Sequence, residues 1–212
     1  MLKDIMVHLD LAPSCKNRLE ASIGLARQHG ANLTGLYVYS SPRMNQPVQQ
    51  SAEVREMFEQ QVEGAGVSFD WLEVDIGFER VGVAEMIGYY TSFTDMLVVS
   101  QPLKADRDKQ YSVITSPERL ILGSGRPVLI IPASGTFPHI GERTMVAWKA
   151  GPKASRAMHD AMPLLQAAKY VNMVSVEKTT FSTGEGERLS RYLERHKVLA
   201  TTELIPPGDL SV

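Results

Sequence analysis

Short apolar runs alternate with amphipathic stretches along the first two thirds of the chain. The apolar runs predict five strands, at 5–9, 33–39, 67–76, 96–99 and 128–131. Between them, apolar residues recur three and four positions apart, as is typical of helices, and Gly, Pro and Ser mark the ends of these helices. Strands that alternate with helices usually pair in parallel and are covered on both faces. The pattern therefore predicts a doubly wound α/β fold with a parallel five-stranded sheet.

The same order of strand, proline-containing turn, helix and strand begins again after residue 142. Met6 matches Met145 and Pro13 matches Pro152, in each case 139 positions further along the chain, and beyond the helix the spacing becomes 138. This internal repeat predicts a complete domain, a linker and a partial second domain with its first three strands, at 1–133, 134–142 and 143–212. The alternative is that any two strand–helix–strand units share such a pattern.

Composition and charge exclude several classes of protein. Hydrophobic residues make up 43% of the chain and charged residues 22%, which excludes a disordered chain and a membrane bundle. The net charge of −2 provides no general positive field, so neither nucleic acid nor a membrane surface is an expected partner. Cys15 is the only cysteine, and the N-terminal segment is too polar for a secretion signal. We therefore expect a cytoplasmic protein.

Few motifs for catalysis or metal binding are present. The chain has no Walker A motif, no glycine-rich dinucleotide loop after a strand and no serine nucleophile elbow, and its five histidines are scattered without metal-ligand spacing. In parallel sheets, ligands bind at the carboxyl ends of the strands, where the strand order reverses. The polar residues that follow the predicted strands are therefore the candidates, at 10, 39–40, 75–77 and 100–101.

The order of these segments resembles the tandem universal stress proteins. The resemblance rests on KDIMVHLDLAPSCKNRLEASIGLARQHGANLTGLYV at the start, on DMLVVSQ and LILGSGRPVLIIP around the fourth and fifth strands, and on RTMVAWKAGPKASRAMHDAMPLLQAA at the start of the repeat. It implies a strand order of 3-2-1-4-5, pairing of fifth strands between domains or subunits, and ATP or AMP binding in some members.

The resemblance also implies where a phosphate would bind. Members that bind ATP have a signature after the fourth strand: Gly, two residues, Gly, nine residues, then Gly-Ser or Gly-Thr. Gln101, Lys104 and Ile114 occupy the three glycine positions here, and Thr115 occupies the hydroxyl position. Each replacement adds a Cβ where a phosphate must approach the backbone, so we expect a degenerate or weak site. Lys104 is either a surface lysine or a point charge for a phosphate.

Two further positions correspond to family residues near the adenosine. Asp10 matches the aspartate beside it, although a short polar residue here could equally cap the next helix or turn the chain. Val38 would meet an adenine through its backbone, or else it packs in the core. In the repeat, Lys149 replaces the aspartate, so nucleotide binding of the usual type is not expected there. With ATP or AMP as the candidate ligand, the candidate binding residues are Asp10, Val38, Ser100, Gln101 and Thr115.

These patterns together predict a regulator or scaffold of the universal stress type that is non-catalytic, or at most a weak ATPase, and binds adenine nucleotides weakly. One alternative is a stress protein that binds ATP or AMP, with or without hydrolysis of ATP. Another is a phospho-receiver domain, for which Asp10, Asp75 and Ser100 have roughly suitable places, although no lysine follows the fifth strand. That strand would form a sheet edge, so we also predict a homodimer through 127–132.

Overall fold

The computed structural model describes residues 1–40, 47–77, 82–103, 117–137, 139–175 and 184–205. The chain divides into two compact units, Met1–His139 and Ile140–Val212. This division falls within the segment 134–142 that the sequence indicates as a linker. In the described part of the chain, no helix combines the length and the apolar character needed to cross a membrane.

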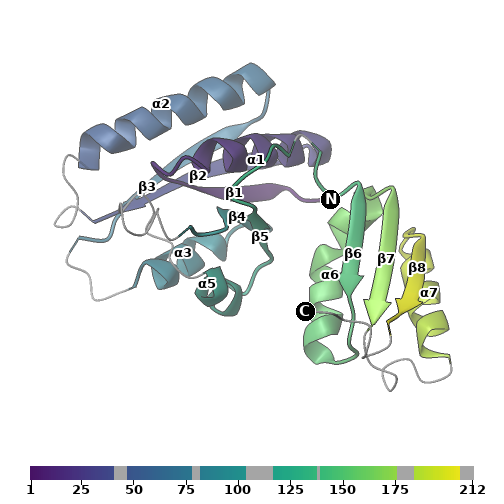
Figure 1. Ribbon diagram of the computed structural model, residues 1–212. Helices are drawn as coiled ribbons and strands as arrows, with labels where there is room; N and C mark the ends of the chain where they lie inside the picture. The colour runs from purple at the N-terminus through teal and green to yellow at the C-terminus, as the bar shows by residue number, and fades with distance from the viewer. Residues whose placement is uncertain (41–46, 78–81, 104–116, 138, 176–183, 206–212) are drawn as a thin grey trace. The chain divides into compact units, whose positions relative to one another are not determined.

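A five-stranded parallel sheet forms the centre of the first unit (Figure 1). Its strands are β1 (Asp4–Leu9), β2 (Asn32–Tyr39), β3 (Phe69–Asp75), β4 (Met96–Ser100) and β5 (Val128–Ile131). They are arranged in the order β3-β2-β1-β4-β5, as the resemblance to universal stress proteins implies. The central strand β1 pairs with β2 on one side, where Ile5 aligns with Leu33, and with β4 on the other, where Ile5 aligns with Met96. The strand order therefore reverses between β1 and β4.

Helices cover both faces of this sheet, with one pair on each (Figure 1). Among the described residues of this unit, the helices are α1 (Cys15–His29), α2 (Pro47–Ala65), α3 (Val83–Thr91) and α5 (Pro117–Gly123). Met6 and Leu36 of the sheet pack with Ile87 of α3 and Leu120 of α5 in one buried cluster. On the opposite face, α2 approaches β2 so closely that a Cβ added at Gly35 would lie 3.0 Å from the Phe58 ring.

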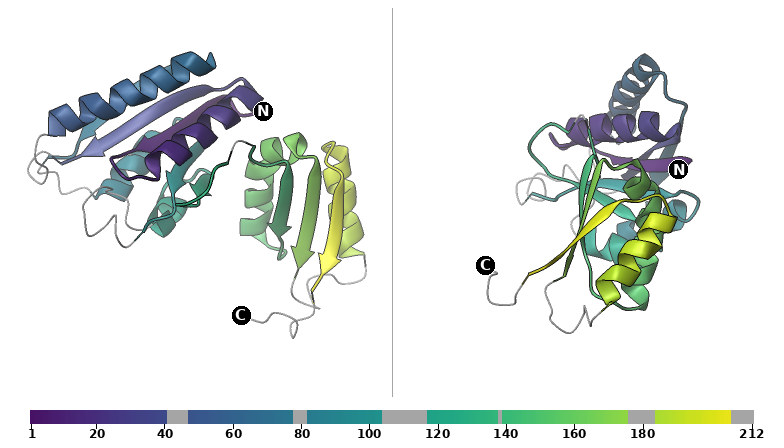
Figure 2. Two further views of the ribbon diagram at one scale, coloured as in Figure 1. Left: turned by 45° about the horizontal axis from the view of Figure 1, so that its top comes forward. Right: turned by 90° about the vertical axis from the view of Figure 1, so that its right-hand side faces the viewer.

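The second unit has a smaller parallel sheet in the order β6-β7-β8. Its elements are β6 (Arg143–Ala147), α6 (Pro152–Ala167), β7 (Tyr170–Ser175), α7 (Glu185–Arg195) and β8 (Ala200–Leu204). Both helices lie on one face of the sheet (Figure 2), and their buried residues form one cluster with Val171 and Met173. The pairing of Arg143 with Tyr170 repeats that of Asp4 with Asn32. This second sheet is consistent with a partial second unit.

Candidate functional site

The carboxyl ends of β1 and β4 lie side by side at the point where the strand order reverses. Asp10 follows β1 directly and Ser100 is the last residue of β4, and the two strands are paired through Val7 and Val98. Arg18 reaches the same place from the first turn of α1. Asp10, Arg18 and Ser100 therefore bring a carboxylate, a guanidinium group and a hydroxyl group to the edge of the sheet where α/β folds bind ligands.

The guanidinium group of Arg18 connects the ends of the two strands. Its Nη2 donates a hydrogen bond of 2.9 Å to Oδ1 of Asp10, and its Nη1 donates one of 2.6 Å to Oγ of Ser100. Only 2% of Arg18 is exposed, which makes it the largest fully buried side chain of the described residues. A buried charge requires a partner of opposite charge, and Asp10, which is 6% exposed, provides it. The fork of the guanidinium allows it to contact both strand ends at once.

The carboxylate of Asp10 also shapes the turn that leads from β1 into α1. Its Oδ1 accepts a hydrogen bond of 3.1 Å from the backbone N–H of Ala12, two residues further along the chain. Asp and Asn side chains commonly stabilise turns through this contact. The structure thus shows the turn-forming role considered for Asp10, and the same oxygen also accepts the bond from Arg18. Its role beside an adenosine stays a prediction.

Two other ionisable groups near the ion pair are uncharged at neutral pH because they are buried. Burial lowers the pKa of His8 to about 4, although the negative charge of Asp10 opposes this shift. The Nδ1 atom of His8 lies 3.6 Å from Oδ2 of Asp10, too far for a hydrogen bond. Burial also raises the pKa of the Cys15 thiol. Of these four side chains, Asp10 and Arg18 therefore carry opposite charges at pH 7, and the two charges compensate each other.

The other predicted site residues have different environments. Val38 is 3% exposed and its side chain packs in the cluster of Met6 and Leu36, which is the core packing considered for it. Gln101 is exposed, and its backbone N–H donates to the carbonyl of Ile131, which extends the pairing of β4 with β5. Lys104, Ile114 and Thr115 lie outside the described residues, so the predictions for the degenerate glycine signature stay predictions.

Arg18 is not among the site residues predicted from the sequence, yet it connects Asp10 with Ser100. A signal for it exists in the chain. The buried face of α1 includes Cys15, Leu19 and Ser22, and Arg18 lies on this same face at helical spacing. A charged residue inside the stripe that packs against the sheet requires a buried partner, and Asp10 lies within reach on the preceding turn.

Asp75 lies apart from this cluster, at the end of an edge strand. It aligns with Tyr39 of β2, and β2 separates β3 from β1. Its Oδ1 accepts a hydrogen bond of 2.8 Å from the N–H of Gly77. In receiver domains the strand order is 2-1-3-4-5, which places the third strand in the centre beside the first. The observed order separates Asp75 from Asp10, so the geometry does not support the phospho-receiver alternative.

The second unit does not repeat the cluster. At the spacing of 139, the positions of His8, Asp10 and Arg18 are occupied by Ala147, Lys149 and Ala157. The second unit therefore has neither the carboxylate nor the guanidinium group at these positions. Among the residues that the structure describes, no three His, Cys, Asp or Glu side chains are placed to hold a metal ion.

Comparison with known proteins gives matches only at the level of the fold. No protein-family model and no curated protein matches the sequence. The structure of a universal stress protein from Archaeoglobus fulgidus DSM 4304 aligns with a TM-score of 0.73 and 15% identity, over 96% of this chain and 76% of that one. A structure from Pseudomonas aeruginosa UCBPP-PA14 with the same family name aligns with a TM-score of 0.61 and 13% identity, over 97% and 75%. The chain has the universal stress protein fold.

Proposed function

We propose that this chain is a non-catalytic regulator or scaffold of the universal stress type, whose first unit binds adenine nucleotides weakly or not at all. The observation that carries the proposal is the bridge from Arg18 to Asp10 and Ser100. Two of the side chains that a nucleotide would need at the strand-order reversal are already bonded to a buried cation of the protein itself.

The strength of this bridge explains why a nucleotide would compete poorly. Separating one partner from a buried ion pair costs about 3–5 kcal/mol, because an uncompensated charge stays inside the protein. Each 1.4 kcal/mol corresponds to about a tenfold change in Kd, so opening the bridge would weaken binding by about two to four orders of magnitude. A micromolar nucleotide site would thereby become a millimolar one.

Isothermal titration calorimetry of the full chain with ATP and Mg²⁺, and separately with AMP, tests this proposal. We expect no saturation below about 1 mM of either nucleotide, in keeping with the weakening estimated above. A micromolar Kd would overturn the proposal and support the alternative, a protein that binds ATP or AMP. In that case Asp10→Ala should abolish binding, and a steady release of phosphate would add ATP hydrolysis.

We further propose that the chain forms a homodimer through β5. This strand pairs only with β4 in the described sheet, so its outer edge carries backbone groups available to another strand. Ile130 is 38% exposed, and the neighbouring helix α5 leaves Ile121 and Leu122 exposed by 51% and 87%. An unpaired edge beside exposed apolar side chains favours association.

Light scattering at tens of micromolar protein tests the dimer. We expect twice the mass of the chain for the wild type and the single mass for Ile130→Pro, because proline removes one backbone donor and disrupts strand pairing. A wild-type monomer at this concentration would contradict the dimer.

The single cysteine is buried and makes no disulfide, which suits the reducing cytoplasm that we propose as the location.

A further inference from the structure

A cavity of about 340 Å³ lies in the second unit between α6 and α7. Its described lining combines aromatic and aliphatic side chains with one serine and one arginine: Trp148, Ser155, Met158, Arg188, Leu189 and Tyr192. The volume lies within the range of about 300–1,000 Å³ that is typical of small-molecule sites. The cavity is therefore large enough for a compact organic ligand.

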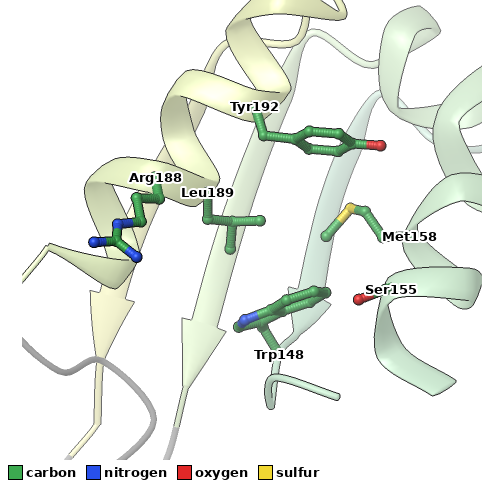
Figure 3. A pocket seen from close by; sticks show the side chains of 6 residues that line it. All are labelled: Trp148, Ser155, Met158, Arg188, Leu189 and Tyr192. Atoms are coloured by element: carbon green, nitrogen blue, oxygen red, sulfur yellow. The ribbon is translucent and has the colours of Figure 1, made fainter. Parts of the chain in front are cut away.

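Two aromatic side chains from different elements border this space. Trp148 directly follows β6, and Tyr192 belongs to α7. Figure 3 shows their rings on opposite sides of the space, with Leu189 and Met158 at its flanks. A molecule that enters the space would therefore meet a ring on two sides and apolar groups between them.

Each of the two rings is held by contacts of its own. The backbone N–H of Trp148 donates a hydrogen bond of 2.7 Å to the carbonyl of Val174, and the side chain packs against the buried cluster of the second unit. The ring centroid of Tyr192 lies 4.7 Å from that of His196, one turn further along the chain. Side chains that are already positioned lose less conformational freedom when a ligand binds.

The two polar residues of the described lining are placed differently. Figure 3 shows the hydroxyl group of Ser155 pointing toward the space beside the Trp148 ring. Arg188 is exposed, and its guanidinium group lies on the outer side of α7, away from the space between the rings. A hydroxyl group can donate and accept hydrogen bonds, but it does not compensate a charge that has lost its water. This arrangement favours an uncharged ligand.

We propose that the cavity binds a small, neutral, planar aromatic molecule with one polar group. The ring system of the ligand lies between Trp148 and Tyr192, where contacts between aromatic rings add to the burial of apolar surface. The thioether of Met158 adds a sulfur–aromatic contact. The polar group of the ligand forms a hydrogen bond with the hydroxyl of Ser155. This binding activity lies outside the function proposed above, which concerns the first unit.

Titration of the ¹⁵N-labelled full chain with 2-naphthol tests this proposal by nuclear magnetic resonance. The chain has two tryptophans, so Trp71→Phe assigns the two indole N–H signals. We expect 2-naphthol to shift the signal of Trp148 in a saturable way and to leave that of Trp71 in place. Decahydro-2-naphthol has the same carbon skeleton and hydroxyl group without an aromatic ring, and it should bind about three- to tenfold more weakly. The charged 2-naphthoate should bind at least about tenfold more weakly.

Three substitutions at exposed positions provide a second test. Tyr192→Leu removes one ring and should weaken binding of 2-naphthol about three- to tenfold, with a smaller effect on decahydro-2-naphthol. Tyr170→Leu removes a tyrosine of the same unit that is not part of the described lining, and it should leave both affinities unchanged. Ser155→Phe places a ring in the space and should weaken binding of both compounds at least about tenfold.

Several results would overturn the proposal. They are an unchanged Trp148 signal, equal shifts of both indole signals, equal affinities for 2-naphthol and its decahydro analogue, and tighter binding of 2-naphthoate. Equal losses in Tyr192→Leu and Tyr170→Leu, or unchanged binding in Ser155→Phe, would overturn it as well. The calorimetry with nucleotides concerns the first unit, so its outcome does not decide this test.

Discussion

The two units share the same strand–helix–strand arrangement, but one face of the sheet is covered by helices in the first unit and is exposed in the second. In the first unit, Met6 is 3% exposed because α3 and α5 cover this face of the sheet. Met145 holds the corresponding place in the second unit, 139 residues later, and is 68% exposed. The alignment of β-strands is the same in both units, so the repeated pattern determines the pairing but not what packs against the sheet.

The two units also differ in the side chains near the carboxyl ends of their first strands. The first unit closes its strand-order reversal with a buried ion pair, whereas the second has Lys149 and Ala157 at these positions and leaves a cavity between its helices. The difference suggests that the two copies have diverged toward separate tasks, and the following substitutions test this.

The largest expected effect is that of Arg18→Met, which leaves the Asp10 carboxylate buried without its cation. We expect the free energy of unfolding of the first unit to fall by about 3–5 kcal/mol, measured by urea denaturation. Arg27→Met on the exposed side of the same helix is the control and should change it by less than about 0.5 kcal/mol. A small loss in Arg18→Met would show that the ion pair contributes little to the stability of the first unit.

The next effect concerns pH, because His8 is buried in the first unit and alanine replaces it in the second. The folded-state pKa of His8, about 4, lies below its ordinary value of 6.5, so the unfolded chain binds a proton more readily between these values. The contribution of uncharged His8 to the free energy of unfolding is therefore fully present above pH 6.5. It is lost as the pH falls toward 4, and the total loss is roughly 3 kcal/mol.

Urea denaturation of His8→Ala at several pH values measures this contribution. The variant should be less stable at pH 7 because of lost packing, but its stability should depend less on pH between 6.5 and 4. His159→Ala, at an exposed position of the second unit, is the control and should leave the stability of the first unit unchanged. Identical pH profiles of wild type and His8→Ala would contradict the assignment to His8.

A smaller effect is expected from shortening Phe58, whose ring is fully buried in the first unit. Phe58→Leu should lower the free energy of unfolding by roughly 1–2 kcal/mol, because the ring contacts with Phe69 and Trp71 are lost. Gly35→Ala, whose added Cβ would lie 3.0 Å from Phe58, should be less destabilising in the Phe58→Leu background. Purely additive losses would show that the packing of Phe58 does not restrict this position.

The smallest effect is expected on the uncovered face of the second sheet. Met145→Ala should change stability by no more than about 0.5 kcal/mol, as is usual for exposed positions. Met6→Ala, its counterpart in the first unit, should cost about 2–5 kcal/mol. A loss of more than about 1 kcal/mol in Met145→Ala would show that this face is covered in solution.

The sequence predicted the first sheet well because its signal is local. Each strand is a short apolar run, and the strand positions and parallel class follow from these runs. The observed bounds differ at the ends, as in β3, which was predicted over 67–76 but begins at Phe69, because the N–H of Val67 still bonds to Val62 and closes α2. The order of strands came from the resemblance to universal stress proteins rather than from the pattern.

The site was predicted less completely because its bonds join residues that are distant in sequence or hidden in an apolar pattern. Asp10 and Ser100 were found because they follow strands. Arg18 was missed because the buried face of a helix is predicted from its apolar residues, such as Leu19 and Ala26, and a buried cation is not among them.

The two bonds of Arg18 also bear on the order in which the chain folds. The contact with Asp10 spans 8 residues, so it closes a short loop and can form together with the first helix. The contact with Ser100 spans 82 residues and requires β4 to have joined β1. If β4 joins after the rate-limiting step, Ser100→Ala should accelerate unfolding while the rate of refolding stays nearly constant. Stopped-flow kinetics would then show whether the first unit closes its sheet around an arginine already paired with its acid.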